Sequence, residues 1–238
     1  MASQTNKKAK KKTATKMVSV GFLLDETGSM EVVKDKTISA FNEYVDTLRK
    51  DGNEYKIMLG TFNSSIGLQT VAGLTTLDKI RPLDYTNYEP HSNTPLLDAT
   101  AGIIHRMEGA VPKKDAVLIV ILTDGEENAS REHTHKSVAA LIAAKEKLGW
   151  SFIFLAANMD AWRAGALMGV AACNTMSYDV QDIQGTVATA GAATKAYTVA
   201  VNRAGYSGQS VTTLLSTAAP AAFKKARAEN KRKYGAKK

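Results

Sequence analysis

The chain has 238 residues, of which 44% are hydrophobic and 23% are charged. A chain of this length and composition can bury a substantial core, so we expect one domain with tails. No apolar run approaches the roughly 20 residues of a membrane-spanning helix, and no hydrophobic signal segment follows the N-terminus. The single cysteine, Cys173, excludes an internal disulfide and fits a reducing compartment, which favours a cytoplasmic location with no membrane partner.

Charge is distributed unevenly along the chain. Residues 1–16 contain six lysines and no acid, and residues 224–238 contain eight basic side chains and one acidic side chain. Because the whole chain has a formal net charge of +8, the residues between these tails carry a net charge of −5. We therefore predict a disordered Lys-rich tail over 1–16, a folded domain over 17–205, and a small-residue linker or arm with a basic tail over 206–238.

The basic tails allow two interpretations. Clustered cations could bind phosphate backbones without sequence preference, which makes nucleic acid an alternative partner. The other interpretation is that the tails only keep the protein soluble, and the scarcity of aromatic side chains for base stacking favours it. The predicted phosphate contacts would come from Lys7, Lys8, Lys10, Lys11, Lys12, Lys231, Arg232 and Lys233.

The first predicted elements are a buried strand and the polar loop that follows it. Apolar residues over 18–24 indicate a strand, which ends at the sequence Asp-Glu-Thr-Gly-Ser-Met of residues 25–30. Apolar residues at helical spacing predict a helix over 31–50. A strand over 55–62 follows, and a turn leads to a strand over 66–71 that we expect to be an antiparallel edge strand.

The middle of the chain begins with an irregular segment, from about residue 74 to residue 93. Loops of this length inside compact domains are often functional. Thr94 and Pro95 predict the start of a helix over 95–107, with the threonine as its N-cap. The uninterrupted apolar run over 116–122 is typical of a central parallel strand that is covered on both faces.

The remaining elements continue the alternation of strands and helices. They are a helix over 134–148, a strand over 152–157, a short helix near 161–169, a weak strand near 173–178 and a small-residue helix over 183–204. Strands separated by helices indicate βαβ units with right-handed crossovers. We therefore predict an α/β, Rossmann-like, doubly wound fold: a mainly parallel central sheet with helices on both faces and one antiparallel edge strand.

Five oxygen-bearing side chains stand at the predicted carboxyl ends of two strands and at one helix start. Asp25, Thr27 and Ser29 follow the first strand, Asp124 follows the central strand, and Thr94 precedes the helix between them. If the two strands are neighbours, these oxygens converge where open α/β sheets bind ligands. Carboxylates and hydroxyls are ligands that Mg²⁺ prefers, and Mn²⁺ or Ca²⁺ would also accept them. An acidic residue of a protein partner could complete the coordination of such a cation.

Simpler structural roles compete with the metal site. The Asp-x-Thr-x-Ser sequence of residues 25–29 could be an N-capping turn for the next helix. Glu26 and Glu126 are candidates to influence the site without binding the cation, whereas Glu126 and Glu127 could equally be solvated loop charges. We expect Asp98 to face solvent or to cap a neighbouring segment rather than to bind metal.

Three segments together resemble motifs of the von Willebrand factor type A domain. They are Asp-Glu-Thr-Gly-Ser at 25–29, Thr-Pro-Leu-Leu-Asp-Ala at 94–99 and Thr-Asp-Gly-Glu at 123–126. The family builds a metal-ion-dependent adhesion site (MIDAS) from an Asp-x-Ser-x-Ser loop, a separate threonine and a separate aspartate. The matching residues are Asp25, Thr27, Ser29, Thr94 and Asp124. Thr27 departs from the usual serine, which keeps the hydroxyl and adds a methyl group.

The resemblance covers roughly residues 17–205 and extends to the compact bacterial and phage members of the family. It implies that the loop hydroxyls and the threonine can bind a metal directly, while the aspartates often act through water. It also implies a non-enzymatic, metal-dependent protein-binding module whose partner presents Asp or Glu. An AAA+ ATPase is one such partner in small relatives, and the location would be the cytoplasm, or the host cytoplasm for a phage protein.

An enzymatic alternative is a Mg²⁺-dependent phosphatase of the haloacid dehalogenase type. In those enzymes a first aspartate, here Asp25, is the nucleophile, and a second aspartate two residues later is the general acid. Thr27 occupies that second position, and a threonine cannot exchange a proton near neutral pH as this chemistry requires. His133 and His135 cannot share a helix face, and no cysteine is near them, so zinc is also disfavoured. We therefore predict no catalytic residues.

Overall fold

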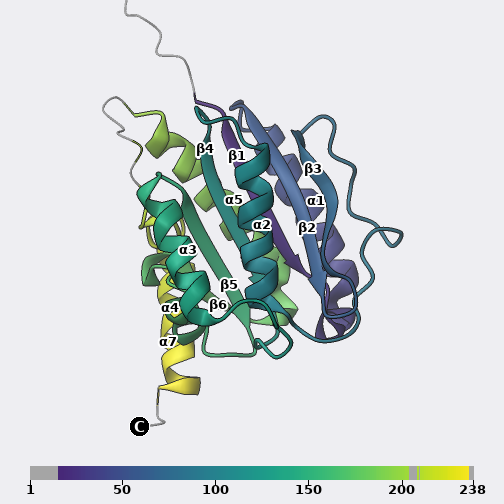
Figure 1. Ribbon diagram of the computed structural model, residues 1–238. Helices are drawn as coiled ribbons and strands as arrows, with labels where there is room; N and C mark the ends of the chain where they lie inside the picture. Colours follow the sequence, from purple (N-terminus) through teal and green to yellow (C-terminus); the bar gives the residue numbers. More distant parts are fainter. Residues whose placement is uncertain (1–15, 204–207, 209, 236–238) are drawn as a thin grey trace, which may run out of the picture.

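The computed structural model describes residues 16–203, 208 and 210–235, and it has a central sheet between two layers of helices (Figure 1). The strands are β1 (Val18–Asp25), β2 (Tyr55–Asn63), β3 (Gly67–Thr76), β4 (Ala116–Thr123), β5 (Ser151–Ala157) and β6 (Thr175–Tyr178). Their order in the sheet is β3-β2-β1-β4-β5-β6. All neighbouring pairs are parallel except β2 and β3, which are antiparallel.

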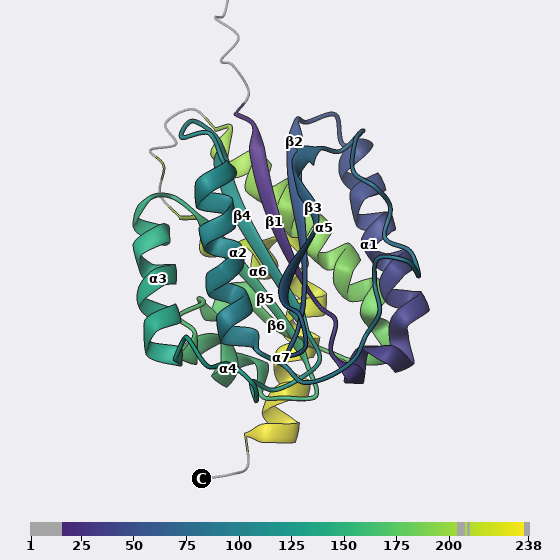
Figure 2. The same cartoon turned by 45° about the vertical axis from the view of Figure 1, so that its right-hand side comes forward.

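Helices cover both faces of this sheet. They are α1 (Lys34–Arg49), α2 (Leu96–Ala110), α3 (His135–Lys147), α4 (Ala161–Leu167), α5 (Ile183–Val201), α6 (Leu214–Ala218) and α7 (Pro220–Tyr234), with 3-10 turns η1 (Gly28–Val33), η2 (Ala172–Asn174) and η3 (Val180–Asp182). Figure 2 shows α2 and α3 on one face and α1 and α5 on the other. The prediction of a doubly wound α/β fold with one antiparallel edge strand is confirmed.

The hydrophobic core is divided by the sheet into two clusters, and successive residues of β1 contribute to opposite ones. Phe22 packs edge-on against Phe41 and Tyr44 of α1, with ring centroids 5.3 and 5.1 Å apart. Leu23 belongs to the other cluster, together with Ile104 of α2. Every residue of β4 is buried, which accounts for its unbroken apolar sequence.

The strand order places the two polar loops at one point. β1 pairs in parallel with β2 on one side and with β4 on the other, so the chain order reverses between β1 and β4. Leu24 of β1 lies opposite Leu122 of β4, and the two strands therefore end side by side. In open α/β sheets such a switch point is where ligands bind.

Two predicted helix starts differ from the structure. The helix predicted over 31–50 begins as the 3-10 turn η1, and its α-helical part starts only at Lys34. Thr94 was predicted to cap the helix that follows it, but α2 begins at Leu96, and its N-cap residue is Pro95, which makes no side-chain capping hydrogen bond. The backbone of Thr94 is hydrogen-bonded instead to Asn128, in the loop after β4.

The residues after position 205 form an ordered arm where the structure describes them. Leu214 and Leu215 of α6 and Phe223 and Ala226 of α7 are buried in the same core cluster as β1. The described part of this segment therefore packs on the domain, and the predicted limits 206–238 of a linker or arm stay a prediction. The domain limits 17–205 themselves stay a prediction, and the tail over 1–15 lies outside the described residues.

No helix among the described residues is both long enough and apolar enough to cross a membrane.

Candidate metal centre

Asp25 is the most firmly held residue of the predicted metal site. Its side chain is fully buried, and its Oδ1 accepts a hydrogen bond from the Thr27 backbone N–H at 2.8 Å. Its Oδ2 accepts a 2.5 Å hydrogen bond from the hydroxyl of Thr123, the last residue of β4. The hydroxyl of Tyr88 donates to the Asp25 backbone carbonyl at 2.7 Å. The carboxylate therefore has one orientation, which is fixed by both strands of the switch point.

A chain of hydroxyl contacts joins the end of β1 to the end of β4. Thr27 Oγ1 lies 3.2 Å from Ser29 Oγ, and Ser29 Oγ donates to Asp124 Oδ1 at 2.5 Å. Thr27 is buried, whereas Ser29 is exposed, so the cluster opens to solvent at the serine. The N-cap residues of η1 and α1, Thr27 and Val33, make no side-chain capping hydrogen bond, which weighs against the N-capping alternative.

Thr94 reaches the same edge from the loop before α2. Its backbone N–H donates to Asn128 Oδ1 at 2.8 Å, and its carbonyl accepts from the Asn128 N–H at 3.1 Å. A Cβ added to Gly125 would lie 2.8 Å from Thr94 Oγ1. The absence of a side chain at Gly125 thus allows the threonine hydroxyl to approach the backbone beside Asp124.

The start of α2 is capped from the loop after β4, and this role was missed from the sequence. Glu127 Oε2 accepts the Leu97 N–H at 2.9 Å, and Ser130 Oγ accepts the N–H groups of Leu97 and Asp98, both at 3.1 Å. Glu127 also accepts backbone N–H groups of its own loop. The sequence shows only a polar stretch after Asp124, and this stretch does not indicate that its side chains cap the distant helix α2.

Asp98 has the capping role that was one of its two predicted possibilities. Its carboxylate accepts the N–H groups of Arg131, Glu132 and His133, at 2.7, 3.1 and 2.8 Å. It therefore fixes the same loop whose Glu127 and Ser130 cap α2.

Glu26 and Glu126, the two predicted neighbours of the site, differ in their surroundings. Glu26 is buried, and its Oε1 accepts the Glu89 N–H at 2.5 Å. Among the described residues its Oε2 has no hydrogen-bond partner. Glu126 is exposed and lines a groove of about 620 Å³ with Leu96 and Met159. An influence of either carboxylate on the metal site stays a prediction.

The carboxyl groups of Asp25 and Asp124 are both shielded from solvent, and this raises their pKa values. Burial raises the pKa of Asp25 to about 6, the charge of Asp124 adds to this rise, and hydrogen bonds from Thr123 and Thr27 oppose it. Burial also raises the pKa of Asp124, against a hydrogen bond from Ser29. Neither aspartate forms an ion pair with a described lysine, arginine or histidine. A bound cation would supply the missing positive charge.

The donor set fits a hard divalent cation. The described residues contain no cluster of three His, Cys, Asp or Glu side chains that could hold a metal by themselves. This site has two such side chains, and its other candidate ligands are the hydroxyls of Thr27, Ser29 and Thr94. Hard cations such as Mg²⁺ accept hydroxyl and water oxygens beside few carboxylates, so the set suits them rather than softer metals that need nitrogen or sulfur.

The strand order and this polar edge define the class: a doubly wound α/β protein with an oxygen-rich site at its switch point. The chain has the von Willebrand factor A fold, as the resemblance implied. No family model matches the sequence, and no curated protein matches it.

Three solved structures are similar to this fold at low sequence identity. A mutant of the PilB minor pilin from Streptococcus sanguinis has a TM-score of 0.57 and 13% identity, over 78% of this chain and 62% of the pilin. Proximal thread matrix protein 1 from the mussel byssus, with zinc in its MIDAS motif, has a TM-score of 0.51 and 12% identity, over 73% of this chain and 46% of that protein. Manganese-loaded TRAP protein from Plasmodium vivax has a TM-score of 0.51 and 13% identity, over 73% and 72%.

The chain spans about half the length of the mussel protein and less than two thirds of the pilin. At these identities the similarity shows the fold alone.

Proposed function

We propose that this chain is a non-enzymatic protein-binding module that captures an acidic residue of a partner through a divalent cation. Asp25, Thr27, Ser29, Thr94 and Asp124 would hold the cation, and Mg²⁺ is the candidate that best suits their oxygens. The cation would supply a positive charge to which a carboxylate from the partner binds.

The observation that carries this proposal is the hydrogen-bonded chain from Thr27 through Ser29 to Asp124. It brings hydroxyls and a carboxylate from two strand ends together through the protein's own hydrogen bonds. Such preorganisation lowers the entropic cost of binding. The exposure of Ser29 leaves the cluster accessible from outside. Metals in the mussel and Plasmodium proteins of the same fold support a divalent cation here.

Binding fits the residues better than catalysis does. The Asp25 carboxylate is fully buried and already accepts hydrogen bonds from Thr27 and Thr123, which leaves it poorly placed to attack a substrate. Thr27 also stands where a phosphatase of the alternative class needs its general acid. Whether the partner is an AAA+ ATPase, and whether the protein acts in the cytoplasm, stay predictions from the resemblance.

Affinity capture from lysate of the native cell tests the proposal. The immobilised full chain should retain a partner in Mg²⁺, lose it in EDTA and recover it when excess Mg²⁺ is restored. Ser29→Ala should abolish retention in Mg²⁺ while its circular dichroism spectrum shows that the domain is still folded. Ser216→Ala is the matched control, because among the described residues its hydroxyl bonds only to the Thr213 carbonyl near α6. Retention that survives both EDTA and Ser29→Ala would contradict the proposal.

A further inference from the structure

The outer face of α7 is strongly basic. Its exposed cations are Lys224, Lys225, Arg227, Lys231, Arg232 and Lys233, and Glu229 is the only acid of the helix. None of the six forms an ion pair with a described carboxylate. At about 100° per residue, the first five lie within an arc of about 160° on one side of the helix. We call these five residues the basic face.

The opposite side of α7 is fixed to the domain. Phe223 packs edge-on against Trp162 of α4, with 6.0 Å between ring centroids. Asn230 is buried, accepts the Ala161 N–H at 3.3 Å and donates to Asp160 Oδ1 at 2.8 Å. These contacts bury one side of α7 against the domain, and the basic face on the other side is exposed.

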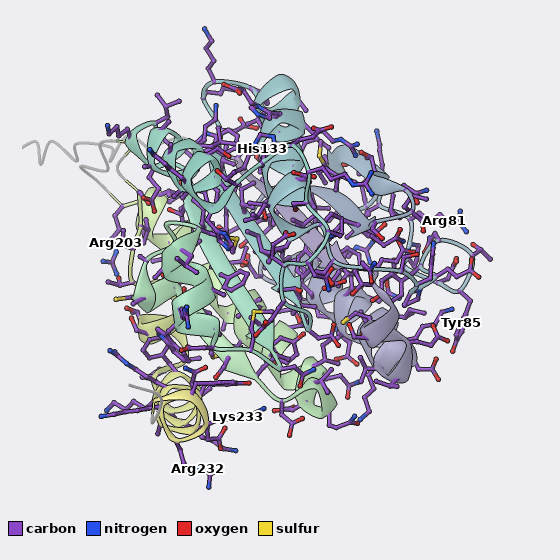
Figure 3. All side chains as sticks on the ribbon, turned by 60° about the horizontal axis from the view of Figure 1, so that its bottom comes forward. Arg81, Tyr85, His133, Arg203, Arg232 and Lys233 are labelled. Carbon is purple, nitrogen blue, oxygen red and sulfur yellow. The ribbon has the colours of Figure 1, made fainter. Side chains whose placement is uncertain are left out.

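The figures place this face at the border of the molecule. Figure 1 shows α7 running past the edge of the sheet toward the C-terminus. Figure 3 views the helix nearly along its axis, and Arg232 projects away from the rest of the protein. A partner can therefore approach the basic face without meeting the sheet.

We propose that the basic face of α7 binds the phosphate backbone of double-stranded nucleic acid without sequence preference. Phosphates follow one another regularly along a duplex, and a row of Lys and Arg side chains binds them by releasing counterions. The segment between the two tails carries a net negative charge, so its own field repels a polyanion and favours contact at α7.

The composition of α7 favours nucleic acid over two other negatively charged partners, an acidic protein and an anionic membrane. Protein interfaces depend on aromatic or large apolar anchors, and in α7 Phe223 is buried and Tyr234 is half-buried. An anionic membrane would require an apolar face to insert, but Phe223 and Ala226 are buried in the core. The absence of stacking aromatics on the basic face favours a duplex over a single strand.

A salt titration of duplex binding tests this proposal. The full chain is titrated with a fluorescent DNA duplex of about 25 bp, and in parallel with an RNA duplex. The KCl concentration is varied from about 50 to about 200 mM, the range in which phosphate contacts weaken strongly. The test variant replaces the five residues of the basic face with glutamine, which keeps helix propensity. Its logarithmic salt slope should become shallower by about 4 to 5, at about 0.9 per phosphate contact.

A matched variant removes the same charge elsewhere. It replaces five exposed lysines of the domain with glutamine: Lys50, Lys113, Lys114, Lys136 and Lys147. This variant should keep the wild-type slope, and so should Ser29→Ala or wild type in EDTA, which separates this proposal from the metal-dependent function. Circular dichroism should show both quintuple variants folded.

Several results would overturn the proposal. They are an absence of duplex binding by the wild type, an equal loss in the matched variant, and an unchanged slope in the α7 variant. Competition by polyglutamate as effective as by DNA would indicate an acidic protein partner instead. Tighter binding to anionic vesicles than to DNA would indicate a membrane.

Discussion

Asp25 has a buried charge that the described residues do not neutralise with an ion pair. Its pKa rises from an ordinary 3.8 to about 6 because burial penalises the charged form. An acid whose pKa is higher in the folded state binds its proton more tightly there, so stability falls as pH rises from about 4 to about 6. Above that range the full cost remains, about 3 kcal/mol for this shift. We therefore expect the buried Asp25 charge to lower the free energy of unfolding of the metal-free domain at neutral pH.

Asp25→Asn should remove this electrostatic cost. In EDTA at pH 7.5, the free energy of unfolding should increase by up to about 3 kcal/mol, and near pH 4 the gain should vanish. Urea unfolding at several pH values measures it, with the exposed Glu43→Gln as a control that removes an equal charge from α1. Saturating Mg²⁺ should stabilise the wild type but not Asp25→Asn. A variant less stable than wild type at pH 7.5 in EDTA would count against the buried-charge explanation.

Thr27 offers a test of the departure from the usual serine. Thr27→Ser keeps the hydroxyl, so Mg²⁺ should raise its Tm as much as it raises that of the wild type. Thr27→Val keeps the shape but removes the oxygen, so the Mg²⁺-induced rise should be lost. Thermal unfolding with Mg²⁺ and with EDTA gives both shifts. Equal shifts for the serine and valine variants would exclude this hydroxyl as a ligand.

Among the helices, strands and loops, those whose signal lies within a short stretch of sequence could be predicted. The apolar run of 116–122 predicted a central strand because burial on both faces leaves no polar position in β4. The loop after β1 was predictable because its oxygens stand close together in sequence. The cap of α2 was not, because Glu127 lies far along the chain from Leu97. α7 escaped prediction because its three buried positions, at 223, 226 and 230, stand among many cations.

The Glu127 cap of α2 should be measurable in stability. Glu127→Ala removes the acceptor for Leu97 and for two N–H groups of its own loop, so it should lower the free energy of unfolding by about 1–2 kcal/mol. Glu132→Ala, in the same loop with an exposed side chain, should change it by less than about 0.5 kcal/mol. Chemical denaturation compares the two variants. Equal effects would mean that the capping contact contributes nothing specific.

At the scale of the whole molecule, α7 is both part of the core and the carrier of excess positive charge. Phe223→Ala should lower the free energy of unfolding by about 3 kcal/mol, the cost of removing a buried aromatic ring. The domain should still unfold in one transition, because Phe223 shares a core cluster with β1 and β4. Calorimetry measures the number of unfolding transitions and the loss of stability, with Lys224→Ala, at an exposed position of α7, as the control. A separate early transition would show that α7 is an independent unit.

We propose above all that the oxygens at the ends of β1 and β4 hold a divalent cation. Crystals of the full chain grown with Mn²⁺ test it directly, because the anomalous signal of manganese locates the ion. We predict one strong peak within bonding distance of the hydroxyls of Thr27 and Ser29, and we expect Ser29→Ala to lack it. A map without this peak, or with manganese bound only to other carboxylates, would contradict it.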